Sequence, residues 1–148
     1  MQQVRLGKTE IIVSKNGFGA LPIQRISKKE AVYLLQKAFY NGINYFDTAR
    51  AYSDSEEKMG AALSYIREKL IISTKTAAQN AEDFRKDLET SLRNLKTDYI
   101  LLKFSFDKLS PYSLGILLFS PNRNINCIPG LLLNLLPYIL TYAYAITN

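Results

Sequence analysis

The chain has 148 residues, a net charge of +6 and a single cysteine. This length allows one domain with a sizeable core. Its positive charges are scattered among carboxylates and form no basic run with interleaved aromatic residues, so we expect no nucleic-acid partner. Cys127 cannot form an internal disulfide, and the polar residues 1–5 do not resemble a signal peptide. We therefore expect a protein of the reducing cytoplasm.

The first helix is predicted to begin at Ser27. Its hydroxyl can accept a hydrogen bond from a free backbone amide while the Glu30 side chain reaches back. The helix should end at residues 41–42, because glycine tolerates the left-handed turn that closes a helix. One apolar stripe is expected to face the core, formed by Ala31, Leu34, Leu35 and Ala38.

Two further helices are predicted on the same grounds. The second should use Ser53 with Glu56 as another capping pair, and the third should begin near Asn80. The second helix is expected to bury Met59, Leu63 and Ile66. The third is expected to bury Phe84, Leu88, Leu92 and Leu95.

Apolar runs predict buried strands at residues 43–47, 69–75 and 99–104. Asp47, Lys75 and Lys103 stand 28 residues apart, each at or near a predicted strand end. This is the length of one strand, one helix and two short loops, so the pattern predicts repeated βα units. In parallel β/α folds the carboxyl ends of the strands meet at one edge, where catalytic groups are usually placed.

Asp47 and Lys75 should leave the sheet at this edge, with Tyr52 in the loop above. A carboxylate, an ammonium and a phenol placed together can make an acid. Each residue alone also fits a structural role: Asp47 could cap a loop, Tyr52 could pack against a helix, and Lys75 could be a solvated strand end.

Several motifs, in order and spacing, resemble the amino-terminal half of an aldo-keto reductase over residues 3–103 or thereabouts. They are residues 46–49 with Tyr52, residues 54–60, Lys75 within residues 73–76, and residues 88–100. Residues 5–9 and 17–19 agree with the hairpin and first strand that open such enzymes. The nearest branch in appearance is one that can carry carboxyl-terminal iron–sulfur motifs.

The resemblance implies an α/β fold, an incomplete (β/α)8 TIM barrel, with a hairpin, about four parallel strands and three helices in residues 1–108. It implies NADPH-dependent reduction of small carbonyl substrates. Tyr52 is then the proton donor and Lys75 stabilises its phenolate. Asp47 orients the Lys75 ammonium and itself lies beside the nicotinamide ribose. Residues 19–21 (Gly19, Ala20 and Leu21) match a segment that approaches the cofactor.

Two departures from the family lead us to expect a truncated chain that is inactive alone. The family usually has a histidine after its fourth strand, but this chain has none, and counting from Asp98 places Phe106 there. A barrel ordinarily needs about 250 residues and frequently builds its phosphate site after strands seven and eight. Alternatives are a non-catalytic remnant or a self-associating interaction module. Four strands of a barrel would leave two sheet edges unpaired, and such edges invite pairing with another chain, so self-association is expected.

Residues 109–148 form an apolar tail with Arg123 as its one charge. A membrane-associated segment at residues 125–146 is one interpretation, although Pro129 and Pro137 argue against a regular helix. A non-native extension, read out of frame or through a stop, is the other. Cys127 alone cannot hold an iron–sulfur cluster, and we expect no metal site.

Overall fold

The computed structural model describes residues 1–7, 10–78, 80–105, 114–119 and 126–127. Strands and helices alternate through most of this part of the chain. The strands are β1 Gln3–Arg5, β2 Ile12–Ser14, β3 Phe18–Gly19, β4 Tyr45–Asp47, β5 Ile71–Thr76, β6 Ile100–Ser105, β7 Leu114–Phe119 and β8 Asn126–Cys127. The helices are α1 Lys28–Tyr40, α2 Ser55–Leu63 and α3 Ala81–Leu95, with short 3-10 helices η1 Pro22–Arg25 and η2 Ser64–Lys69.

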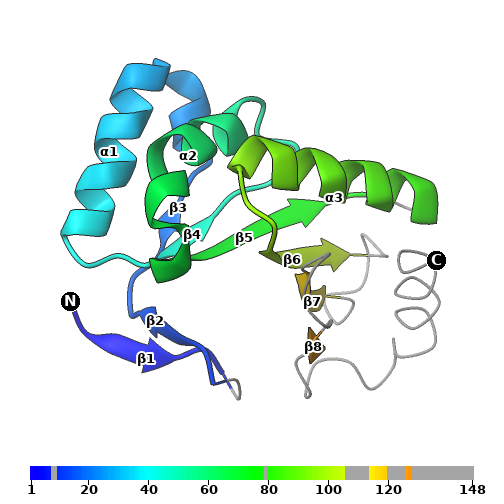
Figure 1. Cartoon of the computed structure of the whole chain (residues 1–148), viewed down its shortest axis with the longest axis horizontal. Coiled ribbons are helices and arrows are strands. Elements are labelled where there is room, and N and C mark those ends of the chain that lie inside the picture. Colours follow the sequence, from blue (N-terminus) through cyan, green and yellow to red (C-terminus); the bar gives the residue numbers. More distant parts are fainter. Residues whose placement is uncertain (8–9, 79, 106–113, 120–125, 128–148) are drawn as a thin grey trace.

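The main sheet has the order β3-β4-β5-β6-β7-β8, and β1 and β2 form a separate antiparallel hairpin. Helices α1, α2 and α3 lie together on one side of the sheet (Figure 1). Strands β3 to β6 are parallel neighbours in chain order. The predicted α/β fold, with an opening hairpin, four parallel strands and three helices, is therefore confirmed.

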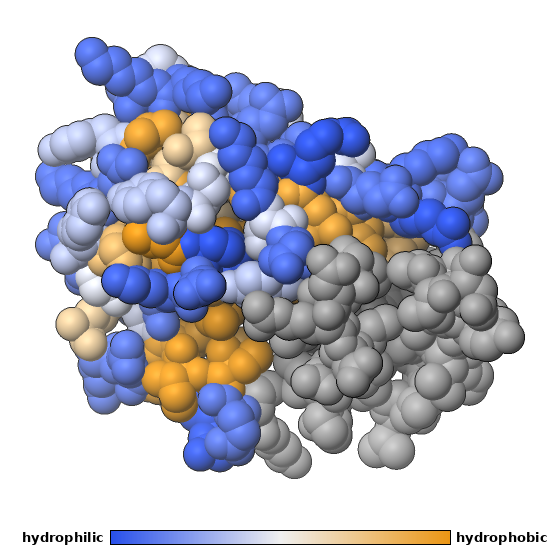
Figure 2. Space-filling view, in the orientation of Figure 1, coloured by the Kyte–Doolittle hydropathy of each residue, from blue (hydrophilic) through white to orange (hydrophobic). Residues whose placement is uncertain are grey.

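The hairpin lies at the amino ends of the parallel strands. Asn44, just before β4, fastens it there: its side chain accepts from the Ser14 amide at 2.6 Å and donates to the Ile12 carbonyl at 3.3 Å. Figure 2 shows apolar side chains gathered over this hairpin, where Val4 and Ile12 are exposed. The opposite, carboxyl ends of the strands are left free for a site.

The edge of the fourth parallel strand, expected to be unpaired, is paired instead. Strand β7 runs antiparallel to β6 along its whole length, and β8 pairs with β7. The expectation of two open edges was wrong because a run of uncharged residues can supply the backbone partners that an edge strand lacks. At the other side of the sheet, β3 pairs only with β4 among the described residues.

Helix α1 begins as predicted. Ser27 accepts from the Glu30 amide at 3.2 Å, and the Glu30 carboxylate accepts from the Ser27 amide at 3.0 Å. Ala31 and Leu35 are fully buried, but Leu34 is 42% exposed, so its assignment to the buried stripe was wrong. At 100° per residue, position 34 lies on the flank of a face centred on 31 and 35.

Helix α2 does not begin as predicted. Asp54 is its N-cap, without a side-chain capping bond, and the Ser53 hydroxyl lies near Gln24 and Asp54 instead. Glu56 is buried and has other partners, as described below. The helix ends at Leu63, so Ile66 falls in the following 3-10 turn, where it is half-buried.

Helix α3 agrees with its prediction. Its N-cap is Asn80, whose side chain accepts from the Asp83 amide at 2.9 Å. Phe84, Leu88 and Leu95 are buried, and Leu92 packs against the core.

The core lies between the helices and one face of the sheet. Phe46, Ile72 and Ile100 contribute from the strands. Leu35, Met59 and Leu63 contribute from the helices. Because successive strand residues point to opposite faces, this arrangement turns the side chains of Asp47, Ser73 and Lys75 to the other face.

Among the residues described, no helix combines the length and apolarity needed to cross a membrane. Phe106 and most of residues 125–146, to which two expectations referred, lie outside the described residues.

Candidate active site

Asp47 and Lys75 meet at the carboxyl ends of neighbouring strands. The sheet register pairs Asp47 with Ser73, so Lys75 lies two residues further along β5 on the same face. Strand β6 pairs Lys103 with Lys75. The 28-residue spacing therefore matches the register between β5 and β6. Between β4 and β5 the register differs by two residues, because Asp47 pairs with Ser73 and not with Lys75. Such a stagger is usual between the strands of a barrel.

The Lys75 ammonium is held by two oxygens. It forms an ion pair with the Asp47 carboxylate and donates to the Thr48 carbonyl at 2.7 Å. The other Asp47 oxygen accepts from the Ser73 hydroxyl at 2.6 Å. Both charged side chains are partly exposed, at 35% for Lys75 and 27% for Asp47. The ammonium is therefore fixed in place and still open to solvent.

Tyr52 lies in the loop between β4 and α2, and its ring faces the ammonium. The Lys75 nitrogen is 5.3 Å from the centroid of the Tyr52 ring, within the range of a cation–π contact. The loop is tied to β5 by backbone bonds from the Thr48 amide to the Ser73 carbonyl and from the Arg50 amide to the Lys75 carbonyl, at 2.8 and 3.0 Å. The three residues singled out in the sequence are thus brought together.

Gly19 is the last residue of β3 and pairs with Asp47, and Ala20 and Leu21 follow it. The Ala20 amide donates to the Asp47 carbonyl at 2.8 Å, and Ala20 is buried, whereas Leu21 is exposed. A Cβ built at Gly19 would meet no atom within 4 Å. The backbone at Gly19 therefore borders open space next to its strand partner Asp47.

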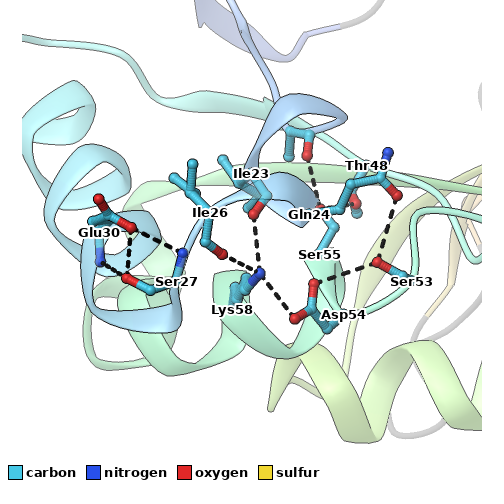
Figure 3. Close-up of polar contacts among 11 residues, drawn as sticks. Ile23, Gln24, Ile26, Ser27, Glu30, Thr48, Ser53, Asp54, Ser55 and Lys58 are labelled. Carbon is cyan, nitrogen blue, oxygen red and sulfur yellow. Dashed lines mark hydrogen bonds and ion pairs between the residues drawn. The ribbon is translucent and has the colours of Figure 1, made fainter.

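Side chains from the first turn of α2 form hydrogen bonds with backbone carbonyls of residues 20–26 (Figure 3). The Ser55 hydroxyl donates to the Ala20 carbonyl at 3.0 Å. The buried Lys58 ammonium donates to the carbonyls of Ile23 and Ile26 at 3.0 and 2.7 Å. Lys58 also pairs with Asp54 at 2.8 Å, and this bond holds the pKa of the Asp54 carboxyl below its usual range.

A cleft of about 720 Å³ opens beside Tyr52 and Lys75. Its far wall comes from the β5–α3 loop and the first turns of α3, with Ala78, Asp83 and Lys86 among the lining residues. The cleft is large enough for a small organic molecule. Nowhere in the described ranges do three or more histidine, cysteine, aspartate or glutamate side chains gather as metal ligands.

Sequence reasoning missed Glu56 and Arg50. Glu56, only 1% exposed, forms an ion pair with Arg50 and accepts from Thr74 and Ser91, each at 2.7 Å. The burial of Glu56 could have been found in the sequence, because residues 56, 59, 60 and 63 share one helical face. Met59 and Leu63 were already expected on the buried side. A carboxylate on that face requires buried partners.

The Aldo/keto reductase family matches residues 15–106, more than half of the chain, and the chain belongs to this family. It is 34% identical over 110 residues to L-galactose dehydrogenase of Arabidopsis thaliana. It is 40% identical over 83 residues to methylglyoxal reductase DkgA of Escherichia coli O157:H7. These matches cover 64% and 54% of this chain, and 34% and 30% of the two relatives, so the chain spans about a third of their length.

Solved structures agree with this assignment. A putative aldo-keto reductase from Pseudomonas aeruginosa is similar with a TM-score of 0.66 and 35% identity, over 72% of this chain and 47% of that one. The holo form of an aldo-keto reductase from Bacillus halodurans is similar with a TM-score of 0.65 and 28% identity, over 71% and 40%.

Proposed function

We propose that the chain carries the carbonyl-reducing site of an NADPH-dependent oxidoreductase, with Tyr52 as the proton donor. One observation supports this above the others: the Lys75 ammonium is held between Asp47 and the Thr48 carbonyl with the Tyr52 ring beside it. A phenol is ordinarily a weak acid, with a pKa of about 10. A fixed cation beside it favours the phenolate that remains after proton transfer.

Each residue of the site has a separate role in the proposed reaction. When bound, the cofactor supplies the hydride that reduces the carbonyl carbon. The Tyr52 hydroxyl gives its proton to the carbonyl oxygen, so that aldehyde or ketone, hydride and proton together give an alcohol. Lys75 stabilises the phenolate, and Asp47 keeps the ammonium in place. Solvent reaches Lys75 and can return the proton to Tyr52.

Two observations around Asp47 support the proposal of a dinucleotide cofactor. The Asp47 carboxylate is partly exposed and can accept from a ribose hydroxyl, and the open space at Gly19 lets a ligand approach the backbone of residues 19–21. Gly19, Ala20, Leu21 and Asp47 are therefore proposed to hold the cofactor. The choice between NADPH and NADH is part of the test.

The names of the relatives suggest the first substrates. Methylglyoxal reductase and L-galactose dehydrogenase are named for small carbonyl compounds or sugars. We propose a small aldehyde, ketone or aldose for this chain, because the cleft beside Tyr52 has room for a molecule of that size.

Calorimetric titration of NADPH and NADH, followed by assay with methylglyoxal and L-galactose, tests the proposal. Micromolar binding of one nucleotide and its consumption with a carbonyl substrate are expected. Asp47→Asn should weaken binding about tenfold or more, since a hydrogen bond to a charged group contributes about 1.5–3 kcal/mol. Absence of binding at millimolar nucleotide would contradict the proposal.

A second candidate is a module that binds the nucleotide without turnover. It is favoured by the absence of histidine from the whole chain, with phenylalanine at the position where the family usually has one. Nucleotide binding with no consumption on any carbonyl tested would favour this candidate.

Three further expectations belong with the proposal. Residues 1–108 are proposed to form the reductase unit, in a cytoplasmic protein, with residues 109–148 as an added segment whose described strands, β7 and β8, extend the same sheet. Self-association is proposed through the β3 edge, which has β4 as its one described neighbour. Sedimentation at several concentrations tests the last point, and a monomer throughout would contradict it.

A further inference from the structure

The Glu56 carboxylate lies behind the candidate site, on the helix side of the sheet. One oxygen accepts from Thr74 of β5 and Ser91 of α3, and the other pairs with the Arg50 guanidinium and lies 3.4 Å from the Asn94 amide nitrogen. Burying a carboxylate is costly unless its oxygens are paired and hydrogen-bonded. Glu56 meets this condition with partners from three separate segments of the chain.

Two of those partners are neighbours of the residues proposed to carry the chemistry. Thr74 immediately precedes Lys75, and because strand side chains alternate, it faces the helices while Lys75 faces the site. Arg50 stands two residues before Tyr52 in the β4–α2 loop. One buried carboxylate thus contacts both the strand that carries Lys75 and the loop that carries Tyr52.

Arg50 adds a second connection. Its buried Nε has no hydrogen-bond partner but lies 3.8 Å from the Asp87 carboxylate, within ion-pair distance. Asp87 in turn accepts from the Thr76 hydroxyl. The two residues that flank Lys75 on β5, Thr74 and Thr76, are therefore both linked to Arg50 through a carboxylate.

We propose that Arg50 and Glu56 are positioning residues that hold the Tyr52 loop against β5 and so set the approach of the phenol to the Lys75 ammonium. This inference rests on the proposed function for its catalytic consequence. Its structural part, the fastening of the loop, does not depend on activity. The Arg50 amide, bonded to the Lys75 carbonyl, and the Tyr52 amide, bonded to the Ala49 carbonyl, report on it directly.

Amide hydrogen exchange measured by NMR tests the fastening. Arg50→Met and the double variant Arg50→Met with Glu56→Gln are compared with wild type. Exchange at the amides of residues 50 and 52 should be faster by about 10- to 100-fold, the factor that one hydrogen bond to a charged group represents. Core amides such as that of Ile72 should exchange as in wild type in the double variant.

The double variant guards against simple misfolding, because it leaves no unpaired buried charge, and replacing a buried ion pair by neutral groups is often tolerated. Arg50→Lys, which keeps the charge, should recover part of the protection. Lys86→Met is the matched control: it removes a positive charge from the same cleft, but Lys86 pairs with Glu82 on its own helix and is 64% exposed. Unchanged loop exchange in the double variant would overturn the proposal.

A kinetic arm separates this inference from the proposed function. If wild type reduces methylglyoxal, the double variant should lose about 10- to 100-fold in kcat with little change in the KM for NADPH. A kcat equal to wild type would overturn the positioning role. If wild type binds nucleotide but shows no reduction, the proposed activity fails, and the exchange experiment still decides whether Arg50 and Glu56 hold the loop.

Discussion

Replacing Gly60 by alanine tests the packing of α2 against α3, on which the Glu56 contacts depend. A Cβ at residue 60 would lie 2.0 Å from the Asn94 carbonyl oxygen and 3.0 Å from two backbone atoms of Leu95. No side-chain rotation can relieve a clash with backbone. The two helices must separate by about 1 Å or more to restore ordinary van der Waals distances.

The net effect follows from two opposing contributions. Alanine is favoured over glycine within a helix by about 1 kcal/mol. Overpacking ordinarily costs about 1–3 kcal/mol. Separation also loosens the contacts of Met59 and Leu95, both fully or almost fully buried, and complete burial of such a side chain is worth about 1.5–3 kcal/mol. The cost should exceed the gain, leaving Gly60→Ala less stable by about 2 kcal/mol.

Urea unfolding followed by circular dichroism measures this difference. Glu57 provides the matched control, since it is exposed on the same helix. At this position Glu57→Ala should be more stable than Glu57→Gly by about 1 kcal/mol. Alanine in place of glycine therefore stabilises the protein at position 57 and destabilises it at position 60. A Gly60→Ala protein as stable as wild type, or more stable, would show that α2 and α3 do not meet at residue 60.

Two other predictions concern buried or paired charges. Arg67→Met should lower the free energy of unfolding by about 2 kcal/mol or more, because the buried guanidinium donates to the Leu70 and Tyr99 carbonyls at 2.7 and 2.6 Å. An unchanged urea midpoint would refute this. The bond with Lys58 lowers the pKa of the Asp54 carboxyl. The ionised Asp54 therefore stabilises the fold fully above the usual pKa of 3.8, and this stabilisation is lost as the pH falls through the lowered pKa. The stability difference between wild type and Asp54→Asn should therefore shrink in acid, and a constant difference from neutral pH down through this range would contradict the assignment.

Local signals in the sequence predicted local structure well. The serine and glutamate three residues apart at Ser27 fix the start of α1, because each residue of such a pair satisfies an otherwise unbonded amide. The same pattern failed at Ser53 and Glu56. There the glutamate lies on the buried helical face, where Arg50, Thr74 and Ser91 compete for its oxygens and withdraw it from any capping role.

The meeting of Asp47, Lys75 and Tyr52 could be anticipated because parallel strands end at one edge. The pairing of β7 with β6 could not, because an uncharged run without alternation fits a strand or a buried helix equally well until its partner is known. The ion pair between Arg50 and Glu56 could not be predicted from the sequence. Its prediction needs both the buried face of α2 and the buried face of β5, and neither pattern alone indicates which buried groups will meet.

The most direct test of the proposed site compares wild type with Tyr52→Phe. The variant keeps the ring beside Lys75 but has no hydroxyl to donate. We expect unchanged affinity for NADPH and a reduction of methylglyoxal slower by about 100-fold or more, the usual contribution of a positioned acid. Equal rates in the two proteins, with equal cofactor affinity, would show that Tyr52 is not the proton donor and would contradict the proposed site.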